Sequence, residues 1–319
     1  MARHFVVTVL IPCHSLNYLS KCIESISLQT MDRNKFEILL IADRIDEQEA
    51  KSILNKFGLN HRVVVSEQSG IVAALNLGLS LITSEFIARM DEDDLMVPNR
   101  LELQYQYLRK HKKTVVVGGQ IDLIDVSDKT IGYSKYRKNV RKRTSQLFDA
   151  SPIAHPTAMI RRSAIEKIGG YRDFLPEDWD LWVRLREVGL IKNLKHTVLS
   201  YRIHPEQLSR EKMYVQNLAR QLVAASYFAR DLGIKDSPEL GDDKYNWLQK
   251  TQNQLRTSSV DFCRFEKKWI RNEIIISTIK NKDKLEYPRI IIQLFLKYPT
   301  ETLSFLFTKV GRRIQHMWR

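Results

Sequence analysis

The chain has 319 residues, of which 43% are apolar and 28% charged, and this composition excludes a fibrous, low-complexity or wholly disordered protein. Its 51 Lys and Arg outweigh 37 Asp and Glu, and the net charge of +14 implies an anionic partner such as nucleic acid, a phosphate-bearing substrate or acidic membrane lipid. The three cysteines, Cys13, Cys22 and Cys263, have no paired spacing, which argues against a disulfide framework and a cysteine zinc site and favours a reducing compartment.

Strands and helices alternate over the first ninety residues. Four nearly continuous, β-branched apolar runs predict strands that are covered on both faces. Amphipathic spacing between the runs predicts crossover helices, the first after Ser15 as N-cap and the second after Asp46. This order predicts an α/β, Rossmann-like, mostly parallel doubly wound sheet, which binds ligands at the carboxyl ends of its strands. The four runs are FVVTVLI (5–11), FEILLIA (36–42), RVVVS (62–66) and EFIARM (85–90).

The α/β pattern continues to about residue 205 and then changes. Beyond Glu206 helical spacing persists without convincing strands, so we expect a catalytic domain over 1–205 and a helical C-terminal region over 206–319. Within the first domain the later elements are a helix from Pro98, strands at 115–119 and 198–204, a strand, helix and Gly-Gly turn in HPTAMIRRSAIEKIGGY, and a helix in PEDWDLWVRLREVG.

Positive charge is concentrated in two segments. Residues 135–147 hold six basic residues and no acid, and residues 261–319 hold 13 basic against 6 acidic residues. The segment 287–313 combines apolar clusters with a basic end, yet no run reaches the ~18 apolar residues of a spanning helix. An interfacial membrane contact, an oligomer contact or an ordinary helical appendage all fit this C-terminal pattern.

Four consecutive acidic residues, 91–94, follow the fourth predicted strand. Adjacent like charges repel unless a cation or a substrate offsets them. Alternation along an extended chain sends Asp91 and Asp93 to one side and Glu92 and Asp94 to the other, so the first pair can share an ion. Such oxygen ligands suit Mg²⁺ or Mn²⁺ with substrate phosphates completing the shell. The alternative is an acidic loop that caps the next helix.

A second acidic group follows Pro176 and comprises Glu177, Asp178 and Asp180. Proline and acids in a first helical turn suit the helix dipole, and that is the structural alternative. If one of these carboxylates is a general base, the dipole lowers its pKa, and burial near the substrate must oppose that effect.

Three further polar residues stand at predicted strand ends or in loops. Asp43 follows the second strand, where it either accepts hydrogen bonds from a nucleobase or ribose or forms a turn. His155 and His204 are isolated histidines that each precede a proline, and each is either a satisfied structural group or a ligand-binding residue.

Taken in order, these features resemble the family-2 glycosyltransferases of the GT-A type, which are nucleotide-sugar-dependent enzymes. The resemblance covers roughly residues 5–209. Its segments are VTVLIP, EILLIAD, QSGIVAALNLGL, IARMDEDD with PNRLE, HPTAMIRRSAIEKIGGY, PEDWDLWVRL and YRIHPEQLS. Two of them depart from the common family pattern: ADRID stands after the second strand and PCHS after the first, and both affect recognition of the base.

The resemblance implies roles for particular residues. Asp93, with Asp91, matches the metal-binding positions for Mn²⁺ or Mg²⁺, and Asp178 matches the catalytic base, with Glu177 as its competitor. The residues implied in donor binding are Pro12, His14, Asp43, Gly70, Asn76, Arg89 and Asp91. Those implied in contact with the acceptor or a phosphate are His155, Arg184 and His204.

The resemblance also implies a reaction, the metal-dependent, inverting transfer of a single sugar from a nucleotide sugar. We expect this donor to be a UDP-sugar. The acceptor is a hydroxyl of a glycan or glycolipid in O-antigen, capsule or lipopolysaccharide synthesis. We expect a cytoplasmic protein that contacts the inner face of the membrane peripherally, and the residues leave the oligomeric state open. Two alternatives remain: a nucleotidyltransferase acting on sugar phosphates, which lacks its glycine-rich phosphate loop here, and a non-catalytic nucleic-acid-binding protein, for which no recognition motif is present.

Overall fold

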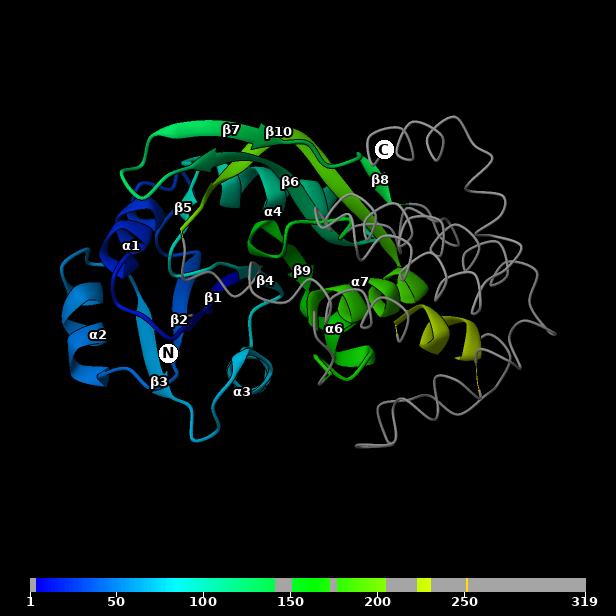
Figure 1. Cartoon of the computed structure of the whole chain (residues 1–319), viewed down its shortest axis with the longest axis horizontal. Helices are drawn as coiled ribbons and strands as arrows, with labels where there is room; N and C mark the ends of the chain where they lie inside the picture. The colour runs from blue at the N-terminus through cyan, green and yellow to red at the C-terminus, as the bar shows by residue number, and fades with distance from the viewer. Residues whose placement is uncertain (1–3, 141–150, 173–176, 205–222, 231–250, 252–319) are drawn as a thin grey trace, which may run out of the picture. The chain divides into compact units, whose positions relative to one another are not determined.

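The computed structural model describes residues 4–140, 151–172, 177–204, 223–230 and 251 (Figure 1). The chain divides into two compact units, residues 1–227 and 228–319, and nearly every described residue belongs to the first. The division at 205 therefore stays a prediction. The predicted segment 287–313 and the basic residues beyond 140 in the first basic segment lie outside the described residues.

The first half of the sheet is parallel, in the order β3-β2-β1-β4. All seven residues of β1 and of β2 are buried, as the continuous apolar runs predict for strands with both faces covered. The strands are β1 (Val7–Cys13), β2 (Phe36–Ala42), β3 (His61–Val65) and β4 (Phe86–Arg89), and the helices between them are α1 (Leu19–Ser27), α2 (Glu47–Asn55) and α3 (Ile71–Leu81).

The second half of the sheet is mixed. Strand β9 (Met159–Arg161) runs antiparallel to both β4 and β6 (Thr114–Ile124), and β10 (Leu190–Arg202) then pairs parallel with β6. Helices α6 (Arg162–Lys167) and α7 (Glu177–Val188) lie together, with α6 against β9 (Figure 1). The remaining elements are β5 (Leu95–Met96), α4 (Arg100–Lys110), β7 (Thr130–Ser134), β8 (Asn139–Val140) and the 3-10 turn η1 (His155–Thr157). The α/β class predicted from the sequence is confirmed.

The helix starts show which capping predictions were right. Asp46 caps α2 by accepting the Glu49 N–H at 2.7 Å, as predicted. Ser15 does not cap α1, because the helix begins at Leu19 and Tyr18 occupies the cap position without a side-chain bond. The Ser15 hydroxyl instead accepts the Asn17 N–H at 3.3 Å in the loop before the helix.

Backbone hydrogen bonds bring three strand ends together. Asp43 N–H donates to the Cys13 carbonyl at 2.8 Å, and Met90 N–H donates to the Leu10 carbonyl at 3.1 Å. The acidic segment that follows β4 therefore starts beside the ends of β1 and β2, at the edge where α/β sheets bind ligands. Among the residues described, no helix combines the length and apolarity that crossing a bilayer requires.

Candidate functional site

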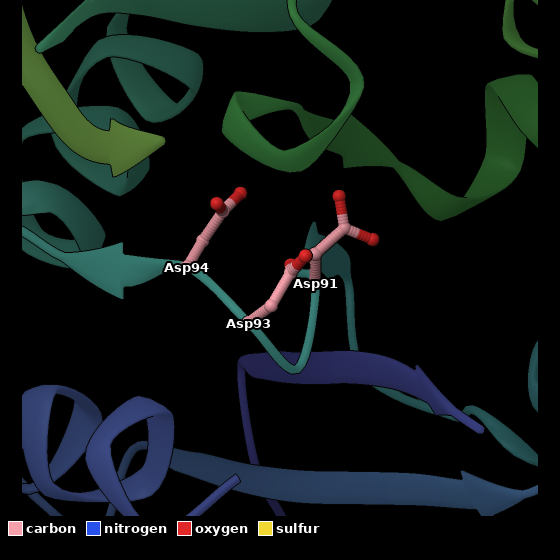
Figure 2. Close-up of side chains that lie close together, drawn as sticks. All are labelled: Asp91, Asp93 and Asp94. Atoms are coloured by element: carbon pink, nitrogen blue, oxygen red, sulfur yellow. The ribbon is translucent and has the colours of Figure 1, made fainter. Parts of the chain in front are cut away.

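Three carboxylates from the segment after β4 converge. One oxygen each of Asp91, Asp93 and Asp94 lies within 4.8 Å of the others, and Figure 2 shows the three side chains leaving the same loop. The predicted alternation was wrong for Asp94, because strand β4 ends at Arg89 and the chain turns at residues 92 and 93 instead of staying extended. Glu92, the fourth acid of the run, is not part of this group: its carboxylate accepts the His14 N–H at 3.2 Å and pairs with His14 Nδ1 at 2.6 Å.

Each of the three converging carboxylates has a different neighbour. Asp91 forms an ion pair with the buried Arg89, and Asp93 Oδ2 lies 2.8 Å from His204 Nε2. Asp94 is fully buried; its Oδ1 accepts the Arg202 N–H at 2.8 Å, while its Oδ2 has no hydrogen-bond partner among the described residues. Burial raises the pKa of Asp94, and the charges of Asp91 and Asp93 raise it further.

The donor set of this carboxylate cluster, Asp91, Asp93 and Asp94, fits a divalent cation. A buried carboxylate oxygen without a partner carries a desolvation cost that a cation removes. Carboxylate oxygens are hard donors typical of Mg²⁺ and Mn²⁺ sites, which share their coordination shell with water and phosphate oxygens. The residues present are therefore suited to the metal that the sequence predicts.

Arg202, at the end of β10, holds the turn at residues 92 and 93 in place, and no sequence pattern marks this role. Its fully buried guanidinium donates from Nε to the Asp93 carbonyl at 2.7 Å and from an Nη to the Asp125 carbonyl at 2.9 Å. It also pairs with Asp128 at 2.6 Å and stacks 4.5 Å from the centroid of the Tyr18 ring. Arg202 thereby fixes the turn through both main chain and charge.

The predicted donor residues lie around the ends of β1 and β2. Asp43 Oδ2 accepts the Gly70 N–H at 2.8 Å, and Asp43 Oδ1 lies 3.2 Å from Arg44 Nε, so this carboxylate ties the end of β2 to the start of α3. Gly70 has φ +107°, a conformation that residues with a Cβ rarely adopt. Pro12, within β1, is buried.

The side chain of Asn76 hydrogen-bonds to the backbone of Tyr171. Its amide donates to the Tyr171 carbonyl and accepts the Tyr171 N–H, both at 2.9 Å, which links α3 to the turn after α6. The predicted donor contact of Asn76 stays a prediction.

The second acidic group opens α7. Asp178 accepts the Ser151 hydroxyl at 3.1 Å, and Glu177 lies 3.4 Å from His155 Nδ1. Burial raises the pKa of Asp178, the nearby Glu177 charge raises it further, and burial likewise raises the pKa of Glu177. Burial thus opposes the helix dipole in the direction that a general base at this position requires.

Two residues predicted to contact the acceptor or a phosphate are engaged elsewhere. Burial, followed by the Arg89 charge, lowers the pKa of His155 to about 3, so the ring is neutral near pH 7, and its two nitrogens face Tyr171 at 2.8 Å and Glu177. Arg184 is buried and pairs with Asp180 at 2.7 Å. The predicted contacts of His155 and Arg184 with the acceptor or a phosphate stay predictions.

Arg89 interacts electrostatically with both acidic groups. Its positive charge lowers the pKa of Glu177, against the larger effect of burial, and its partner Asp91 belongs to the carboxylate cluster. His204 stays with the first group, because it contacts Asp93 and its ring lies 5.5 Å from that of Tyr18. The site can therefore hold a cation at one end and a proton acceptor at the other.

The sequence matches the model of the family described as "Glycosyl transferase family 2" over residues 8–169. An O-antigen biosynthesis glycosyltransferase of Escherichia coli, WbnJ, is 34% identical over 216 residues, which cover 65% of this chain and 84% of that protein. The amylovoran biosynthesis glycosyltransferase AmsE of Erwinia amylovora is 27% identical over 200 residues, covering 61% of this chain and 74% of AmsE.

Solved glycosyltransferases share the fold at low sequence identity. Residues 1–349 of Staphylococcus aureus TarS, in complex with UDP-GlcNAc, superpose with a TM-score of 0.58 at 16% identity, covering 94% of this chain and 91% of that one. The mannosyltransferase PcManGT of Pyrobaculum calidifontis, in complex with GDP-Man and Mn²⁺, gives a TM-score of 0.51 at 15% identity, covering 97% and 89%.

Proposed function

The chain belongs to glycosyl transferase family 2 and has the GT-A fold, and from this premise we propose that it transfers a single sugar from a UDP-sugar to a hydroxyl of a glycan or glycolipid acceptor. The transfer depends on a divalent cation and inverts the anomeric configuration. Two relatives that are named for O-antigen and amylovoran biosynthesis support an acceptor of the surface-polysaccharide class, such as O-antigen, capsule or lipopolysaccharide.

The carboxylate cluster is the observation that carries the proposal. Asp91, Asp93 and Asp94 would hold Mn²⁺ or Mg²⁺, and Asp94 supplies a buried oxygen that has no hydrogen-bond partner within the described ranges. When bound, the cation neutralises the negative charge that develops on the departing diphosphate. Arg202 and His204 keep the turn and the Asp93 carboxylate in place for this task.

At the other end of the site, Asp178 is the proposed general base. It takes the proton from the acceptor hydroxyl as that oxygen attacks the anomeric carbon from the face opposite the diphosphate, and the displacement inverts the configuration. Its raised pKa makes it a stronger base than an exposed aspartate. Glu177, engaged with His155, is the competing candidate.

The uridine end of the donor is assigned to the ends of β1 and β2, where Asp43 ties Gly70 to the strand edge. TarS, solved in complex with UDP-GlcNAc, supports a nucleotide diphosphate sugar as donor, and PcManGT, with GDP-Man, makes the choice of base an outcome to be measured. Pro12 and His14 stand on the same strand end and would form the neighbouring wall.

A donor panel tests the proposal. Hydrolysis and thermal stabilisation are measured with UDP-, GDP- and dTDP-sugars, with and without Mn²⁺, for the natural chain and Asp93→Ala. We expect metal-dependent stabilisation by a uridine donor that Asp93→Ala abolishes. Indifference of the natural chain to all donors would contradict the enzymatic role, and full stabilisation without Mn²⁺ would contradict the role of the cation.

Peripheral contact with the cytoplasmic face of the membrane is also proposed, on the charge of residues 261–319, with 13 basic against 6 acidic residues. Each basic residue near an anionic surface contributes ~1 kcal/mol. In flotation with anionic liposomes, the full chain should float more than a chain that ends at residue 259. Equal recovery of both chains would count against the contact.

A further inference from the structure

An open pocket lies between β6, β7 and β10, and no member of the carboxylate cluster lines it. Its volume is about 660 Å³, and its walls include Asp122, Tyr133, Lys135, Tyr136, Lys138 and Lys195. Gln120 fixes two of its walls: the side chain accepts the Tyr136 N–H at 2.6 Å and donates to the Tyr136 and Leu194 carbonyls at 3.2 and 2.6 Å. The pocket is thus shaped by hydrogen bonds of the protein itself.

The pocket is positively charged. Lys135, Lys138 and Lys195 are exposed, and none of the three ammonium groups has an ion-pair partner in the described part of the chain. Asp122 is the single carboxylate among the lining residues, so three positive charges face one negative charge. The Lys135 ammonium lies 5.1 Å from the centroid of the Tyr133 ring, and Tyr133 is 69% exposed. An exposed ring beside unpaired ammonium groups suits a ligand with both a sugar or lipid portion and an anionic group.

The pocket is also tied to the proposed catalytic base. Asn193 links the pocket to the segment that contacts Asp178. Its backbone N–H donates to the Lys138 carbonyl at 3.0 Å, and its amide donates to the Arg137 and Pro152 carbonyls at 2.9 Å. Pro152 follows Ser151, whose hydroxyl donates to Asp178. Tyr136, which lines the pocket, has a pKa raised by burial and, to a lesser extent, by the Asp178 charge.

We propose that this pocket, which we name the lysine pocket, binds the phosphate or diphosphate group of the acceptor and presents the acceptor hydroxyl to Asp178. The inference rests on the proposed function and adds a substrate class to it: a phosphorylated acceptor. Phosphate is bound well by several cationic donors. Three lysines on two walls of the pocket provide them, and phosphate would not have to break an ion pair among the described residues to reach them. A lipid-linked diphosphate and a soluble sugar phosphate share this chemistry.

The test uses the full chain in metal-free buffer, because without a cation the carboxylate cluster repels phosphate. Calorimetric titration with inorganic pyrophosphate is run on the natural chain and on the triple variant Lys135→Gln, Lys138→Gln, Lys195→Gln. We expect the variant to bind about tenfold more weakly, or ~1.4 kcal/mol. The matched control, Lys110→Gln, Lys112→Gln, Lys113→Gln, removes the same charge from exposed positions around the end of α4 and should bind like the natural chain. Equal weakening in both variants, or no saturable binding to the natural chain, overturns the proposal.

Two further arms distinguish the sources of phosphate. Farnesyl diphosphate represents a lipid-linked acceptor, and glucose 1-phosphate represents a soluble one. The ligand that binds more tightly to the natural chain, and is lost in the triple variant, identifies the source. If the triple variant still binds that ligand, the assignment is overturned. The single variant Lys195→Gln should show a smaller loss and serves if the triple variant unfolds. Stabilisation by a UDP-sugar with Mn²⁺ is measured in parallel. Pyrophosphate binding through the lysines without donor stabilisation refutes the proposed function alone, and the reverse result refutes the lysine pocket alone.

Discussion

Replacing Arg202 with methionine should destabilise the protein and disable the cation site together. The substitution keeps much of the side-chain volume but removes the donors to the Asp93 and Asp125 carbonyls and the partner of Asp128. Arg202 is fully buried, whereas Asp128 is 32% exposed and still pairs with Lys21, so the cost falls mainly on the Asp93 and Asp125 carbonyls. Breaking a buried charge network costs about 3 kcal/mol or more, which lowers the thermal midpoint by roughly 6–12 °C.

The assay has two readouts and a matched control. Urea denaturation gives the change in the free energy of unfolding, and Mn²⁺ with a UDP-sugar gives the stabilisation that depends on the carboxylate cluster. Arg62→Met serves as control, because Arg62, on β3, makes a double hydrogen bond at 3.1 and 2.8 Å to the buried Glu37. This variant therefore also loses a charged partner, but not one of the carboxylate cluster. Arg62→Met should keep the metal-dependent stabilisation. A loss below about 1 kcal/mol in Arg202→Met with that stabilisation intact would refute the positioning role.

The remaining predictions concern the base, the cluster and the donor edge. Asp178→Asn should lower turnover about 10²–10⁴-fold without preventing donor binding, measured by single-turnover kinetics. Rate falls as pH drops through the pKa of the base, and Glu177→Gln should move this acid limb to lower pH, because the Glu177 charge raises the pKa of Asp178. The pKa of Asp94 is raised in the folded chain, so above the ordinary aspartate pKa this residue destabilises the folded state. Asp94→Asn should therefore raise the thermal midpoint of the metal-free chain at pH 7, and it should abolish stabilisation by Mn²⁺. Gly70→Ala should cost about 1–3 kcal/mol in urea denaturation, because φ is +107°.

Apolar runs made the first half of the fold predictable. The residues of β1 and β2 are buried on both faces, so their sequence signal is continuous and the strand limits fall within two residues of those expected. Strand β10 was predicted only from 198, yet it begins at Leu190. Its first half alternates buried residues with partly exposed or exposed ones such as Lys192 and Lys195, and this pattern hides a strand that pairs beside β6.

The candidate site was predictable where the ligand atoms are carried by a run of acids and not where the contacts are distant in sequence. Asp91 and Asp93 stand out as adjacent like charges, and the structure brings them together. Asp94 was placed on the wrong side, because side-chain alternation holds only for extended chain and the segment turns. Arg202 reaches the turn from more than a hundred residues away, and no local spacing marks it. The burial of His155 and Arg184 depends on the folded chain and has no marker in the local sequence.

We propose that Asp91, Asp93 and Asp94 hold a divalent cation that binds the donor diphosphate, and calorimetric titration of Mn²⁺ in the presence and absence of UDP decides this point. We expect one Mn²⁺ ion to bind, with an affinity that UDP increases and that Asp93→Asn lowers about tenfold or more. This expectation would be contradicted by an Asp93→Asn variant that binds Mn²⁺ as tightly as the natural chain, or by a natural chain that takes up no Mn²⁺ even with UDP present.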